Sequence, residues 1–270
     1  MRECSKSIVR RLNDSNFTRK YFVGVGVDVG GKPDPLVLYK QLFPMMESVR
    51  TWDWEDGDAE FMEGVADNTF DFLFASHCLE HLRDPHVGIR NWLRVVKPGG
   101  HLIVNVPEED LYEQGIFPST YNRDHKHTWT MGKEASWSPN SINVVEFVQT
   151  LGPGADVRKL EVIDATYRYD LPRIDQTLAP VAECAIEMII RKRTDAEIAK
   201  GGRVQWGGQP TPEVRLHFNQ YMDDQATLRS ANKDKPPFKN DLELESGDQG
   251  RETKSFVSGA GTGSNPLLGA

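Results

Sequence analysis

The most regular pattern in the chain is a pair of short apolar runs with an amphipathic stretch between them. Residues 70–75 and 101–106 are almost continuously apolar, which is typical of strands in the middle of a parallel sheet, where both faces are covered. Asp84 and Pro85 favour the start of a helix, and apolar side chains then follow along one helical face, namely Ile89, Trp92, Leu93 and Val96. We expect Pro98-Gly99-Gly100 to end this helix. The pattern therefore predicts a strand–helix–strand unit with a right-handed crossover.

The N-terminal part of the chain extends this pattern. Residues 21–29 and 47–52 are predicted strands, with a glycine turn at 30–35 and a short helix over 35–45 between them. Residues 1–20 are polar and basic, but loosely spaced apolar side chains favour a short amphipathic helix, namely Ile8, Val9 and Leu12. We expect this segment to be either a lid or docking helix or, equally, a solvated arm.

After the central unit the pattern is interrupted by a long segment, residues 107–139. It is longer than most loops inside compact domains, which favours a functional role, and its aromatic content argues against disorder. Residues 141–151 are a predicted helix with one apolar face, formed by Ile142, Val145 and Val148. Residues 160–169 and 184–191 are predicted strands, and we expect them to be antiparallel neighbours.

Alternating strands and helices predict an α/β fold: a doubly wound, Rossmann-like, mostly parallel sheet with an antiparallel strand near its C-terminal end. We expect an N-terminal arm or lid over 1–20 and a single domain over 21–200. Residues 201–270 shift to Gly, Pro, Asn, Asp, Lys and Gln. A helix around 212–228 is conceivable, but residues from 233 onward carry almost no core-forming side chains, so we predict a low-complexity, largely disordered tail.

Composition narrows the classes of function. The net charge of −8 argues against a nucleic-acid partner, because binding to phosphates is driven mainly by Lys and Arg. Three widely spaced cysteines indicate neither a disulfide framework nor a zinc ribbon, which favours a reducing, cytoplasmic setting. No apolar run approaches the roughly 18 residues that span a bilayer, and the N-terminus lacks the apolar core of a signal peptide. The oligomeric state is left open.

Polar and glycine residues follow the predicted strands. In open α/β sheets the ligand binds beyond the carboxyl ends of the strands, where the strand order reverses. This rule places one group of residues on the same rim, together with the loop after Val106: Gly30, Gly31, Asp53, Asp58, Ser76 and His77. The glycines do not match a dinucleotide fingerprint, because Gly24 and Gly26 lie inside the strand and Lys32 stands where a third small residue is expected. A phosphate-binding P-loop motif is also absent.

An adenosine ligand without phosphates fits these residues better. Asp28, just before the glycine pair, would meet a cation or an amine. Asp53, at the end of the next strand, can accept both ribose hydroxyls, and Asp58 with Ala59 could read the adenine amino group. If residues 26–28 were the second strand, Asp28 could hold the ribose instead. The pattern is that of S-adenosylmethionine.

Four motifs resemble the successive motifs of class I S-adenosylmethionine-dependent methyltransferases of the small bacterial type. They are Asp28–Gly31, Gly57–Ala59, the run FDFLFASHCLEHL at 70–82 and the run LRVVKPGGHL at 93–102. The resemblance covers residues 21–107 closely and extends loosely to about 193. It implies methyl transfer with S-adenosylmethionine as the cofactor, bound by eight residues: Asp28, Gly30, Gly31, Asp53, Asp58, Ala59, Ser76 and His77.

A histidine is the expected catalytic base. Methyl transfer from a sulfonium is an in-line displacement that depends on alignment, and a hydroxyl acceptor must also lose its proton. Imidazole suits this role because its pKa lies near the working pH. The candidates are His77, His125 and His127, of which we prefer His125; alternatively, these histidines only bind loop backbone. Four aromatic residues could form the wall of the acceptor pocket: Tyr112, Phe117, Tyr121 and Trp129.

The remaining alternatives concern metal binding and the acceptor. His77 and His81 are four residues apart, but the acid is Glu80 and the HExxH motif is absent, so we predict no metal site even with His125 and His127 included. We expect O-methylation of a sugar, glycan or other small polar metabolite. N-methylation of a small molecule and a non-catalytic binding protein of the same fold are alternatives. A nicotinamide-dependent oxidoreductase is disfavoured by the glycine spacing.

Overall fold

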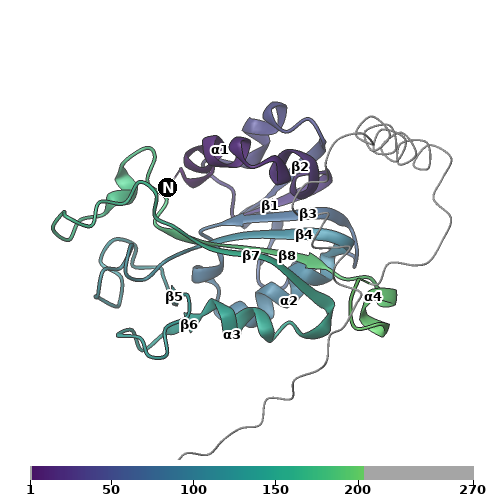
Figure 1. Ribbon diagram of the computed structural model, residues 1–270. Helices are drawn as coiled ribbons and strands as arrows, with labels where there is room; N and C mark the ends of the chain where they lie inside the picture. The colour runs from purple at the N-terminus through teal and green to yellow at the C-terminus, as the bar shows by residue number, and fades with distance from the viewer. Residues whose placement is uncertain (1, 204–270) are drawn as a thin grey trace, which may run out of the picture. The chain divides into compact units, whose positions relative to one another are not determined.

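The computed structural model describes residues 2–203 (Figure 1). Six strands form one sheet in the order β2-β1-β3-β4-β8-β7. The first four are parallel, whereas β8 is antiparallel to both β4 and β7. Their bounds are Gly24–Val29 for β1, Met46–Trp52 for β2, Phe70–Ser76 for β3, Val96–Pro107 for β4, Ala155–Ile163 for β7 and Ala185–Lys192 for β8. The predicted mostly parallel sheet with a C-terminal antiparallel strand is confirmed.

Helices cover both faces of this sheet (Figure 1). The helix α1, Glu3–Asn13, packs on one face together with the 3-10 helix Leu36–Leu42. On the other face lie α2, Pro85–Val95, and α3, Val144–Gln149. The shorter elements are the π-helical turn Phe17–Tyr21, α4 at Asp195–Ala199, the paired strands β5 (Thr128–Thr130) and β6 (Ser141–Asn143), and the 3-10 turns Trp54–Asp56, Leu79–His81, Gly152–Gly154 and Gln176–Leu178.

The central position of β3 in the sheet explains why its sequence does not alternate between apolar and polar residues. Phe72 and Phe74 face the cluster that contains α1, whereas Leu73 and Ala75 face the cluster that contains α2. All four side chains are almost completely buried. Because helices cover both faces, both sets of positions must be apolar.

The helix α2 begins as predicted but ends earlier. The backbone N–H groups of His86 and Val87 donate to the Asp84 carboxylate at 2.8 and 3.2 Å, which satisfies two of the free donors at the helix start. The helix ends at Val95, so the expectation that Pro98-Gly99-Gly100 ends it is wrong. Those residues lie inside β4, where a Cβ at Gly100 would come within 2.4 Å of the Asp71 carbonyl oxygen. Glycine is needed there for close strand packing.

Several predicted boundaries also shift. The strand expected at 21–29 begins at Gly24, and the helix expected at 35–45 is the shorter 3-10 helix. The strand expected at 160–169 runs over Ala155–Ile163, and it is the antiparallel neighbour of β8, as expected. The helix expected at 141–151 begins only at Val144, after β6, and its buried residues are Val144, Phe147 and Val148, whereas Val145 is exposed.

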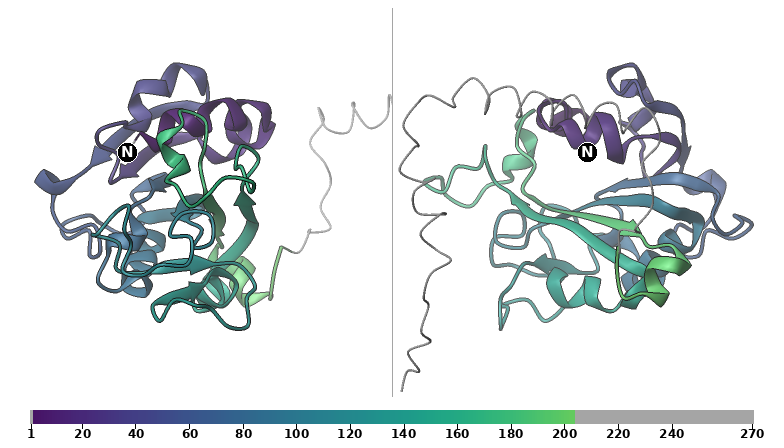
Figure 2. Two further views of the ribbon diagram at one scale, coloured as in Figure 1. Left: turned by 90° about the vertical axis from the view of Figure 1, so that its left-hand side faces the viewer. Right: turned by 45° about the vertical axis from the view of Figure 1, so that its right-hand side comes forward.

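The N-terminal helix is anchored to the sheet by buried charges. Arg11 on α1 is fully buried, and its Nη2 lies 2.9 Å from Oε2 of Glu187 on β8. Arg10 pairs with Glu183 at 2.7 Å, and Lys6 Nζ donates to the Thr177 carbonyl at 2.6 Å, so the segment between β7 and β8 also contacts α1 (Figure 2). The alternative of a solvated arm is therefore wrong, whereas a lid function stays a prediction.

The long segment 107–139 is ordered around one carboxylate. Glu109 is fully buried and accepts hydrogen bonds from the hydroxyls of Thr128, Ser136 and Ser141 and from Lys133 Nζ, at 2.6 to 3.0 Å. These partners come from β5, β6 and the turns between them, so the segment folds back on itself. The expectation of an ordered segment is confirmed.

Three further expectations concern membrane-spanning helices, the cysteines and the C-terminal residues. Within the described residues, no helix combines the length and the apolar character that crossing a membrane requires. The cysteines at positions 4, 78 and 184 are all buried and free. The helix around 212–228 and the tail from 233 onward lie outside the described residues.

Candidate functional site

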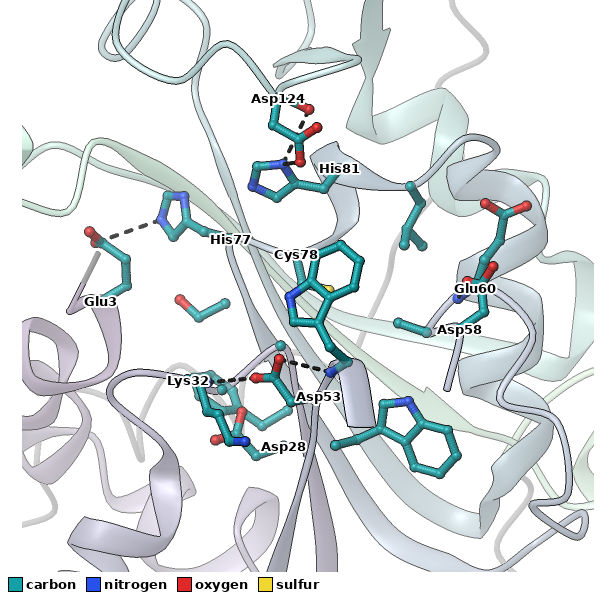
Figure 3. A pocket seen from close by; sticks show the side chains of 18 of the residues that line it. Glu3, Asp28, Lys32, Asp53, Asp58, Glu60, His77, Cys78, His81 and Asp124 are labelled. Carbon is teal, nitrogen blue, oxygen red and sulfur yellow. Dashed lines mark hydrogen bonds and ion pairs between the residues drawn. The ribbon is translucent and has the colours of Figure 1, made fainter. Parts of the chain in front are cut away.

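A cavity of about 700 Å³ lies at the carboxyl ends of β1, β2 and β3 (Figure 3). The chain passes from β1 outward to β2 and then returns to the other side of β1 for β3, so the strand order reverses beside β1. This is the position at which open α/β sheets bind their ligands. Residues of α1 and of the segment 107–139 complete the walls of the cavity.

The glycine pair after β1 forms a turn that other residues would obstruct. Gly30 has φ of 72°, a conformation that residues with side chains rarely adopt, and a Cβ there would lie 2.9 Å from Cys78 Sγ. A Cβ at Gly31 would lie 2.3 Å from Oδ2 of Asp28. The turn therefore folds closely over Asp28, and a ligand can approach its backbone.

Asp28 at the end of β1 is a buried carboxyl group with a free acceptor. The Leu36 N–H donates to its Oδ2 at 2.7 Å, whereas Oδ1 has no partner among the described residues. Burial raises the pKa of Asp28 to about 7; the Leu36 hydrogen bond opposes this shift, and the nearby Asp34 and Asp53 add to it. The free oxygen suits a ligand that carries a positive charge or an N–H group.

Asp53 and Asp58 follow β2 and are more exposed. The N–H groups of Trp54 and Lys32 donate to Asp53 Oδ1 and Oδ2 at 2.9 and 3.1 Å. A carboxylate has about four lone-pair directions, so each oxygen can still accept one hydroxyl. Asp58 accepts from the Glu60 N–H and from Arg83 Nη2, both at 2.8 Å. Trp54 also lines the cavity and is 91% exposed, which is unusual for a tryptophan.

His77 follows β3 and lies between two acids, Glu80 and Glu3, of which Figure 3 shows Glu3. Its φ is 54°, a left-handed conformation that is uncommon outside glycine, and the residue lines the cavity. Nδ1 lies 3.4 Å from Glu80 Oε1, and Nε2 lies 3.8 Å from Oε2 of Glu3 on α1. Burial alone would lower the pKa of His77, but the two carboxylates raise it above its ordinary value.

The cavity gathers all eight residues that the sequence predicted to bind the cofactor: Asp28, Gly30, Gly31, Asp53, Asp58, Ala59, Ser76 and His77. Asp28 lies on β1 and not on a second strand, so the alternative that residues 26–28 form the second strand is wrong. Of the three candidate bases, His77 lines the cavity.

The other two histidines and the aromatic residues lie elsewhere. His125 is buried behind the wall, with Nδ1 2.7 Å from Glu113 Oε1, and His127 Nε2 lies 3.3 Å from the Arg83 carbonyl. None of the four aromatic residues expected in the acceptor pocket lines this cavity. Tyr112 and Trp129 are instead almost completely buried in the protein interior.

Several lining residues were not found from the sequence. Glu3 and Cys4 come from α1. Their position in the cavity wall depends on packing of α1 against residues more than 70 positions later in the chain, which no local sequence pattern predicts. Trp54 had a local signal, because a tryptophan in the polar stretch after a strand has no core position to fill. The segment 107–139 contributes Asn122, Asp124 and Lys126.

Comparisons with known proteins give one family. Residues 35–104 match the model of the methyltransferase domain family. A segment of 58 residues is 38% identical to an uncharacterised methyltransferase of Schizosaccharomyces pombe; it covers 22% of this chain and 20% of the relative. The match thus spans about a fifth of that relative's length.

Solved structures resemble the chain more distantly. A putative methyltransferase from Bacillus halodurans C-125 is 15% identical, with 69% of this chain and 99% of that chain covered and a TM-score of 0.44. An S-adenosylmethionine-dependent methyltransferase from Archaeoglobus fulgidus is also 15% identical, with 71% and 95% covered and a TM-score of 0.44.

Proposed function

We propose that this chain, in which residues 35–104 match a methyltransferase domain, is a class I S-adenosylmethionine-dependent methyltransferase that transfers a methyl group to a hydroxyl of a sugar or another small polar metabolite. The observation that carries the proposal is the cavity beside β1, which gathers a glycine turn, strand-end acids and a histidine. Its volume of about 700 Å³ lies within the usual range for small-molecule sites.

The cofactor's methionine part would lie at the glycine turn. Asp28 Oδ1, which is buried and has no partner among the described residues, would accept from a cationic or N–H group there. The two free lone pairs of Asp53 would accept the ribose hydroxyls. When bound, S-adenosylmethionine supplies an activated methyl group, and the protein's part is to align the acceptor and exclude water.

The adenine would lie near Trp54, Asp58 and Ala59. Trp54 offers an exposed aromatic face at the cavity, and stacking of a base on such a face is worth about 1–3 kcal/mol. Asp58 keeps a free lone pair on each oxygen beside its bonds to Glu60 and Arg83. This placement supports an adenosine ligand more than a phosphate-bearing one.

His77 would be the general base, in place of His125, which the sequence favoured. His77 lines the cavity, and its neutral form would take the proton of the acceptor hydroxyl. Glu80 and Glu3 would then stabilise the imidazolium that forms. Because these acids raise its pKa, the turnover rate should rise with pH through a value above the ordinary pKa of histidine.

The acceptor would contact the segment 107–139. Asn122, Asp124 and Lys126 line the cavity from this side and can donate to or accept from several hydroxyls. Such polar groups support a hydroxylated small molecule or glycan over an apolar one. Because all three cysteines are free, a reducing, cytoplasmic setting is part of the proposal.

Calorimetry and a methyl-transfer screen test the proposal. We expect S-adenosylmethionine, but not NAD, to give heat of binding, and a labelled-methyl screen to find an acceptor among sugars, glycans and small metabolites. Absence of binding to S-adenosylmethionine would refute the proposal. Binding without transfer to any acceptor would instead favour the non-catalytic alternative.

Replacing His77 tests the base. His77→Asn suits the positive φ and removes the imidazole. We expect kcat to fall about 10²–10⁴-fold with the dissociation constant of the cofactor nearly unchanged. The control is His86→Ala on α2, outside the cavity, which should keep the wild-type rate. A His77→Asn variant with wild-type kcat would show that His77 is not the base.

A further inference from the structure

Three side chains that can bind a metal ion meet at the wall of the cavity. Glu80 and His81 lie on the 3-10 turn after β3, and His125 comes from the segment 107–139. Their potential ligand atoms lie within 4.8 Å of one another. Glu80 Oε1 is 3.8 Å from His125 Nε2 and 3.9 Å from His81 Nε2. The side chains of Glu80 and His125 are 0% exposed.

The buried atoms of this cluster lack partners. Both carboxylate oxygens of Glu80 and the Nε2 of His125 have no hydrogen-bond partner among the described residues. A buried carboxylate without partners is costly, because it has lost its hydration without replacement. His77 Nδ1 is 3.4 Å from Oε1, and the two other imidazoles lie farther away than a hydrogen bond reaches.

In both histidines the other ring nitrogen, Nδ1, lies within hydrogen-bond distance of an acceptor. His125 Nδ1 lies 2.7 Å from the buried Glu113 carboxylate. His81 Nδ1 lies 2.9 Å from Asp124 Oδ2 and 3.2 Å from the Asp124 carbonyl oxygen (Figure 3). An imidazole that donates from Nδ1 has, in its neutral form, a lone pair on Nε2. Both histidines then direct lone pairs toward a carboxylate, and a cation placed between these acceptors would satisfy all of them at once.

We propose that Glu80, His81 and His125 bind one divalent transition-metal ion, with Zn²⁺ as the best-matched candidate. Two histidines and one glutamate are a ligand set of catalytic zinc sites, and carboxylates that hold the distal ring nitrogens are the usual second layer around such ions. Bonds of about 2.0–2.1 Å in a tetrahedron place ligand atoms roughly 3.3 Å apart. The separations of 3.8 and 3.9 Å thus need to contract by about half an ångström on binding.

The position of the site suggests its use. His81 also lines the cavity, so an ion held by the cluster adjoins the space in which the acceptor would lie. A metal ion with a free coordination position binds a hydroxyl oxygen and lowers its pKa. This role rests on the proposed function, whereas the metal site itself does not.

Calorimetric titration of the full chain with ZnCl₂, after dialysis against EDTA, tests the site. We expect one Zn²⁺ per chain and a higher Tm with Zn²⁺ than with EDTA, because an ion that binds only the folded state stabilises it. Glu80→Gln and His81→Ala should each weaken binding at least about tenfold, and Glu113→Gln, which removes the second-layer carboxylate, by about 10–100-fold. His86→Ala, a histidine outside the cluster, is the matched control and should bind like the wild type.

Two results would overturn the site: no binding of Zn²⁺, Mn²⁺ or anaerobic Fe²⁺ by the wild type, or wild-type affinity in both Glu80→Gln and His81→Ala. His81 is partly exposed, so its variant should fold even if the Glu80 variant does not, and circular dichroism checks this. S-adenosylmethionine binding is measured on the same samples. If the protein binds S-adenosylmethionine but no metal ion, the metal site is refuted and the proposed function is unaffected.

Discussion

Asp28 and Asp53 lie at the ends of neighbouring strands, but their surroundings make them chemically different. Asp28 is 1% exposed and has a pKa raised by burial, whereas Asp53 accepts two backbone N–H groups in a partly exposed turn. At the scale of single residues, burial therefore separates two acids that look equivalent in the sequence. Asp28 can respond to pH in the physiological range, because its pKa is about 7.

The first prediction concerns Asp28 and the cofactor. A cationic ligand prefers the ionised carboxyl group, so the affinity for S-adenosylmethionine should increase as pH rises through about 7. Asp28→Asn should weaken binding about fivefold at pH 8, since a charged hydrogen bond is worth about 1 kcal/mol more than a neutral one. It should also remove the pH dependence between pH 6 and 8. Calorimetry at several pH values measures both effects, and equal slopes for variant and wild type would contradict them.

At the scale of elements, α1 completes the site through buried ion pairs. Arg11 is fully buried between Glu187 and the rings of Phe17 and Phe74, which lie 4.5 and 5.0 Å from its guanidinium carbon. Glu187 also pairs with Arg10 and Lys159. These cations hold its pKa at about 2 despite burial, which alone would raise it. Since Glu3 and Cys4 of the same helix line the cavity, this network positions part of the cavity wall.

The second prediction concerns this network. Glu187→Gln leaves Arg11 buried without a carboxylate, which should lower the free energy of unfolding by about 3–5 kcal/mol. The control is Glu183→Gln, which breaks only the pair with the partly exposed Arg10; since Arg10 keeps its pair with Glu187, the loss should be smaller, on the order of 1 kcal/mol. Urea unfolding followed by circular dichroism measures both. Similar losses in the two variants would contradict a special role for the buried pair.

At the scale of the whole molecule, the buried carboxyl groups determine how stability changes with pH. Burial raises the pKa of Asp28 from 3.8 and that of Glu108 from 4.5, both to about 7. The folded state holds these protons more tightly than the unfolded state. The contribution of the two groups is therefore full below about pH 4 and is lost as pH rises toward 7. Glu187 acts in the opposite sense, because its contribution is lost as pH falls from 4.5 to about 2.

The third prediction follows from these signs. The Tm of the ligand-free protein should fall between about pH 4 and pH 7 and level off above that, and Asp28→Asn should flatten this decline. For Asp28 the effect has an upper limit on the order of 4 kcal/mol, since each unit of pKa shift corresponds to 1.36 kcal/mol. Thermal unfolding at intervals of half a pH unit measures the curve. A Tm that rises steadily to pH 8 in the wild type would contradict the prediction.

The fold was largely predictable because its strongest signals are local. The apolar run of β3 and the stripe and cap of α2 depend on spacing within a few residues, and burial on both sheet faces makes them conspicuous. Local sequence patterns failed to predict the structure where the packing of segments that are distant in the sequence determines it. Position 100 lies in β4 and requires glycine there, because the Asp71 backbone leaves no room for a side chain. The helix begins only at Val144, after β6, and the face that it buries contains Val144 and not Val145.

The sequence alone determined which residues follow strand ends, and therefore which acids and glycines surround the cavity, since the carboxyl ends of parallel strands share one edge of the sheet. Only the tertiary structure decided which histidine meets that cavity. His77 is fixed to the end of β3, whereas the position of His125 depends on the path of the long segment 107–139, which no periodicity specifies. That path brings His125 to Glu80, 45 positions earlier in the chain, and makes it a candidate metal ligand in place of a base.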